Sequence, residues 1–435
     1  MTKQPTWQIG VFFDGTGNNK YVDYQIDDDQ FEPTNIAKLY ELYPSNLSHQ
    51  QLKIYIKGCG TKDVDDLQNL PEQDPNYSRL MMATGFDVSS KVYSALEQIA
   101  AVTPEAKSVC IDVFGFSRGA TASRFFINKI RELGLKGDCT YWPAECEVRV
   151  RFCGLFDTVG SIGLPGDKDN LLMELDLSPD VADYIYHLTA SHEYRDNFPL
   201  TSILTLPIGN ISSNNHCPQP VCEHFVEEAL YGSHADIGGG YAIGAEKIYL
   251  DVNVERYPPD NQDEKRLAEE QTLALLNHWQ QKKHNSNTKI FVEYEEQLTA
   301  LSLIKLEKVR KAFIVLERHV SKELSFIALE KMLQKALSQG VPFNPLNTHD
   351  IECKVPTALR DAYAAAQAGD KLAMQFIEQH YIHHSHQLVK PKGELFNAMA
   401  VEQDPEYTTE NGKREVFYNT HKTPANINLP PSRLK

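Results

Sequence analysis

The sequence predicts an α/β fold, in which a mostly parallel, doubly wound sheet is flanked by helices and followed by a helix-rich C-terminal portion. Short apolar runs typical of buried parallel strands alternate with stretches in which apolar residues recur at helical spacing. Between one such run and one such stretch lies a serine flanked by glycines, Ser117, as a tight strand-to-helix turn requires. Ligands of such sheets bind beyond the carboxyl ends of the strands, so Ser117 is expected at the functional edge.

Each expected strand is a short, mostly apolar run, and each expected helix carries apolar residues at i, i+3, i+4 and i+7. The pattern indicates strands at residues 7–13, 52–57, 108–114 and 148–156, with less regular runs at 202–206 and 228–231. Helices are expected between them at residues 35–43 and 88–102, and another begins after Ser117. This alternation favours parallel strands joined by helical crossovers.

Beyond about residue 245 the pattern changes to long helical stretches, which we expect at residues 263–283, 296–320 and 324–339. Residues 301–314 are amphipathic with a local basic excess, which fits a helix packed on the sheet or, alternatively, a helix that touches lipid. We therefore expect a catalytic core at residues 1–245, a helix-rich region at 246–390 that caps or completes it, and a polar tail at 391–435.

The composition bounds the function classes. The chain has 435 residues and a net charge of −16, which disfavours nucleic acid or a generic anionic surface as a partner. No apolar stretch reaches the length of a membrane span, and residues 1–30 lack the basic and apolar regions of a signal peptide. The eight cysteines are scattered, as expected for reduced thiols, and the spacing around His216 and His224 fits no common zinc pattern. Neither a metal nor a cofactor is expected.

The run Gly115 to Gly119 has the form G-x-S-x-G, which indicates a nucleophile elbow. A serine hydroxyl needs an imidazole as its base, and a carboxylate to hold that imidazole in one tautomer. Asp157 ends the strand at 148–156 and is the expected acid, while His234 follows the last predicted strand and is the expected base. His383 occurs in the same chain order and is an alternative base.

The first predicted strand ends in a turn of small residues, 14–19, which lacks both G-x-G-x-x-G and the lysine of a P-loop. A nucleotide is therefore disfavoured there. The turn fits better as half of an oxyanion hole, in which a backbone N–H at Asp14 or Gly15 acts together with the N–H of Arg118. The Asp14 side chain could brace this loop.

Four motifs occur in the order of one known family, and they cover the first ~245 residues. They are VFFDGTGNN at 11–19, GFSRGA at 115–120, FDTVGS at 156–161 and HADIGGGY at 234–241. Together they resemble the first group of Tle lipase effectors of bacterial type VI secretion, which have an α/β-hydrolase fold. The resemblance implies Ser117 as nucleophile, Asp157 as acid and His234 as base, and favours His234 over His383.

The resemblance further implies a phospholipase A that cleaves an acyl ester of membrane glycerophospholipids at a bacterial membrane surface. It implies an antibacterial toxin made in the cytoplasm, secreted by a type VI system into the periplasm of target cells, with an immunity protein and a secretion-spike protein as partners. Two alternatives remain: a soluble carboxylesterase that ignores membranes, and a non-catalytic binding protein associated with secretion.

Overall fold

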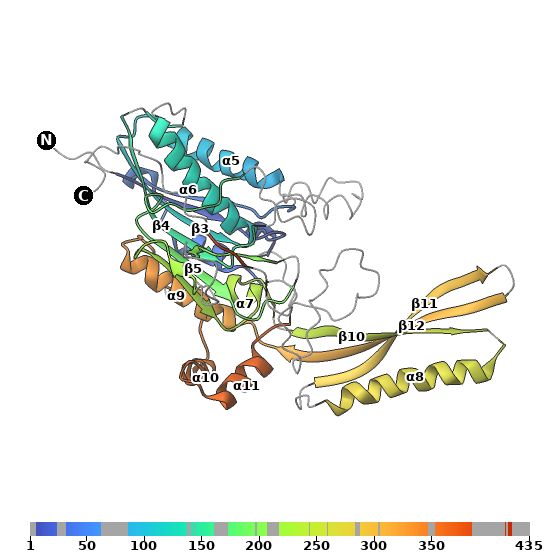
Figure 1. Cartoon of the computed structure of the whole chain (residues 1–435). Coiled ribbons are helices and arrows are strands. Elements are labelled where there is room, and N and C mark those ends of the chain that lie inside the picture. Colours follow the sequence, from blue (N-terminus) through green and yellow to red (C-terminus); the bar gives the residue numbers. More distant parts are fainter. Residues whose placement is uncertain are drawn as a thin grey trace, which may run out of the picture.

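The structure, a computed structural model, shows a sheet-based core from which a long arm projects (Figure 1). It describes residues 6–23, 32–61, 86–136, 141–143, 145–160, 173–195, 198–206, 217–242, 244–258, 260–282, 288–302, 305–346, 353–384, 414 and 416–419.

A six-stranded parallel sheet forms the centre of the core, and this confirms the predicted α/β fold with a mostly parallel sheet. The spatial order is β2-β1-β3-β4-β5-β9. The strands are β1 (Trp7–Phe13), β2 (Gln51–Ile56), β3 (Ser108–Phe116), β4 (Glu147–Phe156), β5 (Ile185–Ala190) and β9 (Phe225–Leu230). Of these, β5 was not predicted, although it separates the strands that precede Asp157 and His234.

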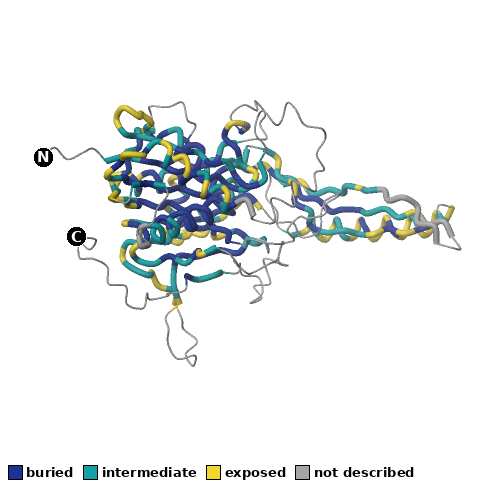
Figure 2. Tube along the Cα trace, turned by 90° about the horizontal axis from the view of Figure 1, so that it is seen from above, coloured by how far each residue is buried: buried dark blue, intermediate teal, exposed yellow. Residues whose placement is uncertain are grey.

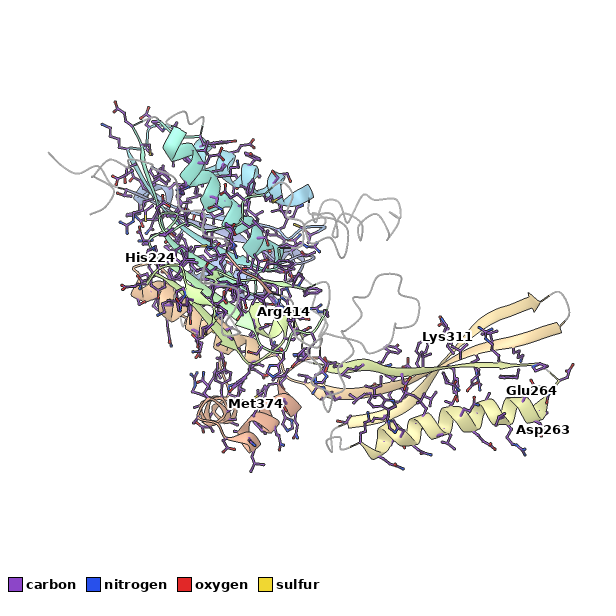
Figure 3. The ribbon with its side chains drawn as sticks, in the orientation of Figure 1. His224, Asp263, Glu264, Lys311, Met374 and Arg414 are labelled. Atoms are coloured by element: carbon purple, nitrogen blue, oxygen red, sulfur yellow. The ribbon has the colours of Figure 1, made fainter. Side chains whose placement is uncertain are left out.

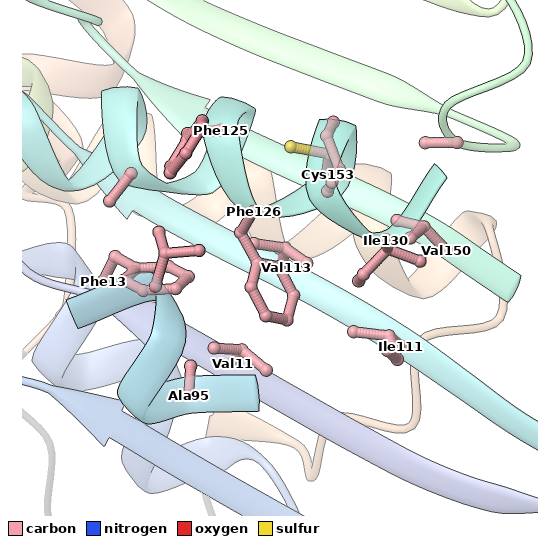
Figure 4. Packing of buried hydrophobic residues seen from close by; sticks show 14 of the residues in the cluster. Val11, Phe13, Ala95, Ile111, Val113, Phe125, Phe126, Ile130, Val150 and Cys153 are labelled. Carbon is pink, nitrogen blue, oxygen red and sulfur yellow. The ribbon is translucent and has the colours of Figure 1, made fainter. Parts of the chain in front are cut away.

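Helices cover both faces of the sheet, as a doubly wound fold requires. On one face lie α5 (Phe86–Val102) and α6 (Arg118–Lys136), and on the other lie α2 (Asn35–Leu42) and α9 (Leu324–Ser338). Successive residues of β1 serve opposite faces: Val11 and Phe13 pack under α5 and α6, as Figure 4 shows, and Phe12 packs under α2 and α9. The buried residues of Figure 2 accordingly concentrate in this layered core.

The arm consists of an antiparallel sheet in the order β10-β12-β11, with one long helix, α8, packed along it. Its elements are β10 (Gly244–Tyr257), α8 (Gln262–Gln281), β11 (Thr288–Ser302) and β12 (Lys305–Val320). The helix predicted at 263–283 is confirmed by α8. The helix predicted at 296–320 is wrong, because that stretch forms most of a β-hairpin, and the alternative of a lipid-touching helix at 301–314 falls with it.

The helix prediction for residues 305–320 is wrong because β12 is the central strand of the arm, between β10 and β11. Residues 312–316 of β12 are all buried, so the strand lacks the apolar–polar alternation that would distinguish it from a helix. Its lysine, glutamate and leucine content favours a helix locally. Long antiparallel pairing with β10 and β11 satisfies the backbone instead and overrides that preference.

The remaining elements are short or peripheral. The helices α10 (Thr357–Gln367) and α11 (Lys371–His380) pack beside α9. Beyond the carboxyl ends of β1 and β9 lie α1 (Lys20–Asp23) and α7 (His234–Gly238), and a 3-10 turn spans Leu47–His49. The predicted strand at 202–206 is replaced by short strands: β6 (Leu200–Thr201) pairs with β13 (Val416–Phe417), and β7 (Leu204–Thr205) pairs with β8 (Gln219–Pro220).

Within the described ranges, the structure has no helix with the length and apolar character needed to cross a bilayer. The division of the chain into 1–245, 246–390 and 391–435 stays a prediction.

Candidate active site

Ser117 occupies a sharp turn between β3 and α6. Its φ of 59° lies in the left-handed region, which a serine adopts only when its surroundings enforce it. The flanking glycines make the turn possible: a Cβ on Gly115 would lie 2.4 Å from Gly119 O, and a Cβ on Gly119 would lie 2.2 Å from Phe13 O. The turn therefore has the strained, glycine-dependent geometry of a nucleophile elbow.

Asp157 lies beside this turn because β3 and β4 are parallel neighbours in register. Phe116 pairs with Phe156, so Ser117 and Asp157 each follow directly after a paired residue, on strands that run about 4.8 Å apart. The Ser117 N–H also donates to Phe156 O at 3.0 Å. Asp157 has a positive φ of 42° and donates its N–H to Leu188 O at 2.7 Å. The two residues therefore leave the sheet at the same edge.

His234 is the first residue of α7, directly after the turn that follows β9. Its Nδ1 donates to Asp157 Oδ2 at 2.6 Å. Its ring lies 4.6 Å from the Phe116 ring and 5.0 Å from the Phe198 ring, measured between centroids. The space for Phe116 depends on Gly238, where a Cβ would lie 2.0 Å from that ring. The structure thus brings the predicted acid and base into contact, beside the residue that precedes the predicted nucleophile.

The environment sets the protonation of this pair. Burial lowers the pKa of His234, although the hydrogen bond and charge of Asp157 act in the opposite direction. Burial alone would raise the pKa of Asp157, but Arg414 and His234 outweigh it and hold the pKa well below its usual range. The pair is therefore a neutral imidazole with Nδ1 protonated and an ionised carboxylate, which leaves Nε2 able to accept a proton from a serine.

Arg414 is a site residue that the sequence did not reveal. Its Nη1 donates to Asp157 Oδ1 at 2.7 Å and its Nη2 donates to Asp157 Oδ2 at 2.8 Å. It comes from the predicted tail, beyond every motif, and a single arginine in a polar segment carries no signal that could have identified it.

A second ion pair holds the loop that follows β5 against His234. Arg195 donates from Nε and Nη2 to Glu193, each at 2.9 Å, and its guanidinium lies 3.4 Å from the Phe198 ring centroid. Glu193 Oε2 in turn accepts the backbone N–H of His234 at 3.2 Å. Charged loop residues are common in any chain, so sequence reasoning missed this pair as well.

Both N–H groups predicted for the oxyanion loop, those of Asp14 and Gly15, already donate hydrogen bonds within the protein. The Asp14 N–H donates to Ile56 O at 2.9 Å, and the Gly15 N–H donates to the carboxylate of Asp14 itself at 2.8 Å. Tyr55 and Thr34 also donate to this carboxylate, so the Asp14 side chain does brace the loop. Burial raises the pKa of Asp14 to about 6.

The next residue, Thr16, is the better candidate for the second donor. Its Oγ1 is buried and has no hydrogen-bond partner within the described part of the chain. The loop contacts the start of α6, since a Cβ on Gly119 would lie 2.5 Å from Asp14 O. Thr16 and the N–H of Arg118, at the start of α6, are therefore the candidate donors of an oxyanion hole.

His383 lies close by but pairs with a different acid. Its Nδ1 donates to Asp236 Oδ1 at 2.6 Å, and its ring stacks on Tyr241 at 4.1 Å. Asp236 also accepts from Ser233, the N-cap of α7. His234, and not His383, contacts Asp157, and this favours His234 as the proton acceptor. The cluster around Asp236 holds the start of α7.

Among the described residues, no group of three or more potential metal ligands converges. Cys222 Sγ lies 3.4 Å from His224 Nε2, which itself contacts Pro179 O at 2.8 Å. His216 lies outside the described residues.

Comparisons with known proteins find a matching family model and similar solved structures. Residues 8–143 and 136–258 match the family model of the catalytic domain of Tle1-like phospholipase effectors of the type VI secretion system. The chain is similar to Tle1 in a solved structure of that effector bound to the VgrG spike, with 24% identity, a TM-score of 0.62, and coverage of 96% of this chain and 94% of that chain. It is also similar to an uncharacterized protein from Pseudomonas aeruginosa, with 20% identity, a TM-score of 0.49, and coverage of 84% and 51%. No curated protein matches.

Proposed function

Because the chain belongs to the family of Tle1-like phospholipase effectors of type VI secretion systems, which are lipolytic hydrolases, we propose that it is a serine hydrolase that cleaves acyl esters of membrane glycerophospholipids. The observation that carries this proposal is the 2.6 Å hydrogen bond from His234 to Asp157, at the sheet edge where the strained turn of Ser117 lies. Nothing in this arrangement needs a metal or a cofactor.

In the proposed mechanism, His234 Nε2 accepts the proton of Ser117 as Oγ attacks the ester carbonyl carbon. Asp157 keeps the imidazole oriented and stabilises the imidazolium that forms. The N–H of Arg118 and the donors of Thr16 stabilise the oxyanion. His234 then returns the proton to the leaving alcohol, and water releases the fatty acid by the same steps in reverse order.

Arg118 supports an anionic lipid as substrate. Its Nη1 is buried and has no hydrogen-bond partner among the residues that the structure describes, and burial lowers the pKa of its guanidinium. A buried Nη1 donor without an acceptor among the described residues is costly, and a phosphodiester oxygen would supply that acceptor. The residue directly after the nucleophile would then hold the phosphate of a glycerophospholipid and place its ester at Ser117.

The primary test measures release of fatty acid from mixed phospholipid vesicles by the parent chain and by Ser117→Ala. The matched control is Ser338→Ala, which changes an exposed serine at the end of α9. We expect a loss of at least about 1,000-fold for Ser117→Ala and parental release for the control. Release by Ser117→Ala at the parental rate would refute the serine mechanism. Substrates with different acyl chains at the two positions identify which ester is cut.

Arg118→Gln distinguishes a phospholipase from a soluble carboxylesterase. The substitution keeps the backbone N–H and removes the charge, so kcat/KM should fall about tenfold or more for phospholipid relative to the neutral ester p-nitrophenyl butyrate. An unchanged ratio of the two rates favours the carboxylesterase.

We also propose that the chain is an antibacterial effector, carried by a spike protein into the periplasm of a target cell and countered by an immunity protein. Membership of the effector family supports delivery by a type VI system. The solved Tle1 complex, in which that protein is bound to VgrG, supports a spike protein as carrier. Directing the parent chain to the periplasm of a test bacterium should arrest growth, and Ser117→Ala should not. Growth arrest by both chains would exclude lipolysis as the cause of toxicity.

A further inference from the structure

The guanidinium of Arg414 is placed on the proposed catalytic acid by a segment from the far end of the chain. Figure 3 shows Arg414 at the core, near the side from which the arm projects. Besides its two hydrogen bonds to Asp157, Arg414 donates from Nε to Phe198 O at 2.7 Å. Three of its donors are therefore fixed, and two of them form a bidentate pair with one carboxylate, which is the strongest geometry available to arginine.

Each oxygen of the Asp157 carboxylate accepts two hydrogen bonds. Oδ1 accepts from the Ala190 N–H at 2.9 Å and from Arg414 at 2.7 Å, and Oδ2 accepts from His234 at 2.6 Å and from Arg414 at 2.8 Å. A carboxylate has about four acceptor positions, so Arg414 fills half of them. We propose that Arg414 is a positioning residue, which holds Asp157 in the one orientation that places the imidazole of His234 for proton transfer.

Electrostatics support this role. Asp157 is fully buried, and an ionised carboxylate in that environment is costly unless a cation compensates it. His234 is neutral before the reaction, so within the described residues Arg414 is the cation that contacts Asp157 directly. The Arg414 Nη2 and His234 Nδ1 share Oδ2 at 2.8 and 2.6 Å, so the two nitrogens are at most 5.4 Å apart. Arg414 therefore also acts on the charge of the imidazolium.

The segment that carries Arg414 is anchored independently of the site. Val416 and Phe417 form β13, which pairs with β6. Asn419 then accepts from the Leu177 N–H at 2.7 Å and donates to Leu177 O at 2.8 Å. These contacts hold the segment without touching Asp157, so docking of the segment and support of the acid can be separated by mutation.

This inference rests on the proposed function, because it assumes that Asp157 serves the His234 base. The test compares the parent chain with Arg414→Gln, Arg414→Lys and the matched control Asn419→Ala. All are assayed as full chains for p-nitrophenyl butyrate hydrolysis, with kcat/KM measured from pH 4.5 to 9. Ser117→Ala is assayed beside them. If Ser117→Ala stays active, the proposed function fails. If it is inactive, the proposed function holds, and the Arg414 variants then test the role of Arg414 separately.

For Arg414→Gln we expect kcat/KM to fall about 10- to 100-fold, because the acid loses its fixed orientation. The acid limb of the profile should move up by about one pH unit, because a cation within 5.4 Å of the His234 ring is lost. Every variant keeps the other titratable groups around the pair, which are Glu193 and Arg195 from the loop after β5 and Asp236 with His383 beside α7.

Arg414→Lys keeps the charge but not the bidentate pair, so it should lose rate while its acid limb stays near that of the parent. It serves as the deciding variant if Arg414→Gln does not fold. Asn419→Ala should leave the acid limb in place, whatever it does to thermal stability. Parental activity in Arg414→Gln would overturn the inference. So would equal losses with unmoved acid limbs in Arg414→Gln and Asn419→Ala, since the segment would then act only by docking.

Discussion

Gly58 controls the position of the oxyanion loop, and a single methyl group there tests the proposed site. A Cβ on Gly58 would lie 1.7 Å from Gly15 O, whereas real Cβ atoms essentially never approach other atoms within 3.0 Å. The loop must therefore move by at least about 1.3 Å in Gly58→Ala. The contact is with backbone, so no side chain can turn away to relieve it.

The loop has little freedom to move without losing its bonds. The Gly58 N–H donates to Asn18 O at 2.9 Å, and the Gly17 N–H donates to Cys59 O at 3.0 Å. Thr16 directly precedes Gly17, so a shift of this segment also moves Thr16. A displacement of about 1 Å in a catalytic group lowers the reaction rate about 100-fold. Loss of one oxyanion donor lowers kcat about 100- to 1,000-fold. We therefore expect kcat for p-nitrophenyl butyrate to fall about 100-fold in Gly58→Ala.

The matched control is Gly244→Ala at the start of the arm, where an added Cβ meets nothing within 4 Å. Thermal unfolding of both variants separates a displaced loop from an unfolded chain, since overpacking is expected to cost about 1–3 kcal/mol. A folded Gly58→Ala chain whose kcat lies within threefold of the parent would refute the placement of the oxyanion loop.

Three further predictions follow from burial and charge. Because burial lowers the pKa of His234, the base stays neutral below its ordinary pKa of about 6.5, so the acid limb of kcat/KM should lie below pH 6.5; a limb above that value contradicts the assignment. Burial raises the pKa of Glu193, but Arg195 outweighs burial and lowers this pKa from 4.5 to about 2. Ionised Glu193 therefore contributes on the order of 3 kcal/mol to the free energy of unfolding. This contribution is complete above pH 4.5 and is lost as the pH falls towards 2. The stability deficit of Glu193→Gln in chemical unfolding should therefore shrink over that range, and a constant deficit would show that the ion pair is not its source. Ile314→Ala removes a fully buried side chain under α8 and should destabilise the arm by about 2–5 kcal/mol in thermal unfolding with kcat for p-nitrophenyl butyrate unchanged; a lower kcat would give the arm a part in the chemistry.

The parts of the fold that could be predicted are those in which local sequence and final environment agree. The strand before Ser117 is buried on both faces, so its continuous apolar run reads directly as a parallel strand. Gly115 and Gly119 mark the turn because no other residue fits there. The contact between His234 and Asp157 follows from two residues that each come after the carboxyl end of a strand, although the unpredicted β5 lies between those strands.

The rest depends on partners that are distant in the chain. Whether residues 305–320 form a strand is decided by pairing with residues 244–257 and 288–302, and no local preference reports that pairing. The engagement of the Asp14 and Gly15 N–H groups depends on Ile56 and on a side-chain rotamer. Arg414 reaches Asp157 across 257 positions of sequence. The residue pattern of a single sequence does not reveal any of these long-range contacts.

The two ends of the arm are next to each other. Gly244, the first residue of β10, pairs directly with Val320, the last residue of β12, so the chain leaves the core and returns to it about 5 Å away. In terms of chain connectivity, the whole arm is a single insertion whose two ends meet at the core. The arm can therefore be lengthened or shortened without moving the strand ends that precede Ser117 and Asp157.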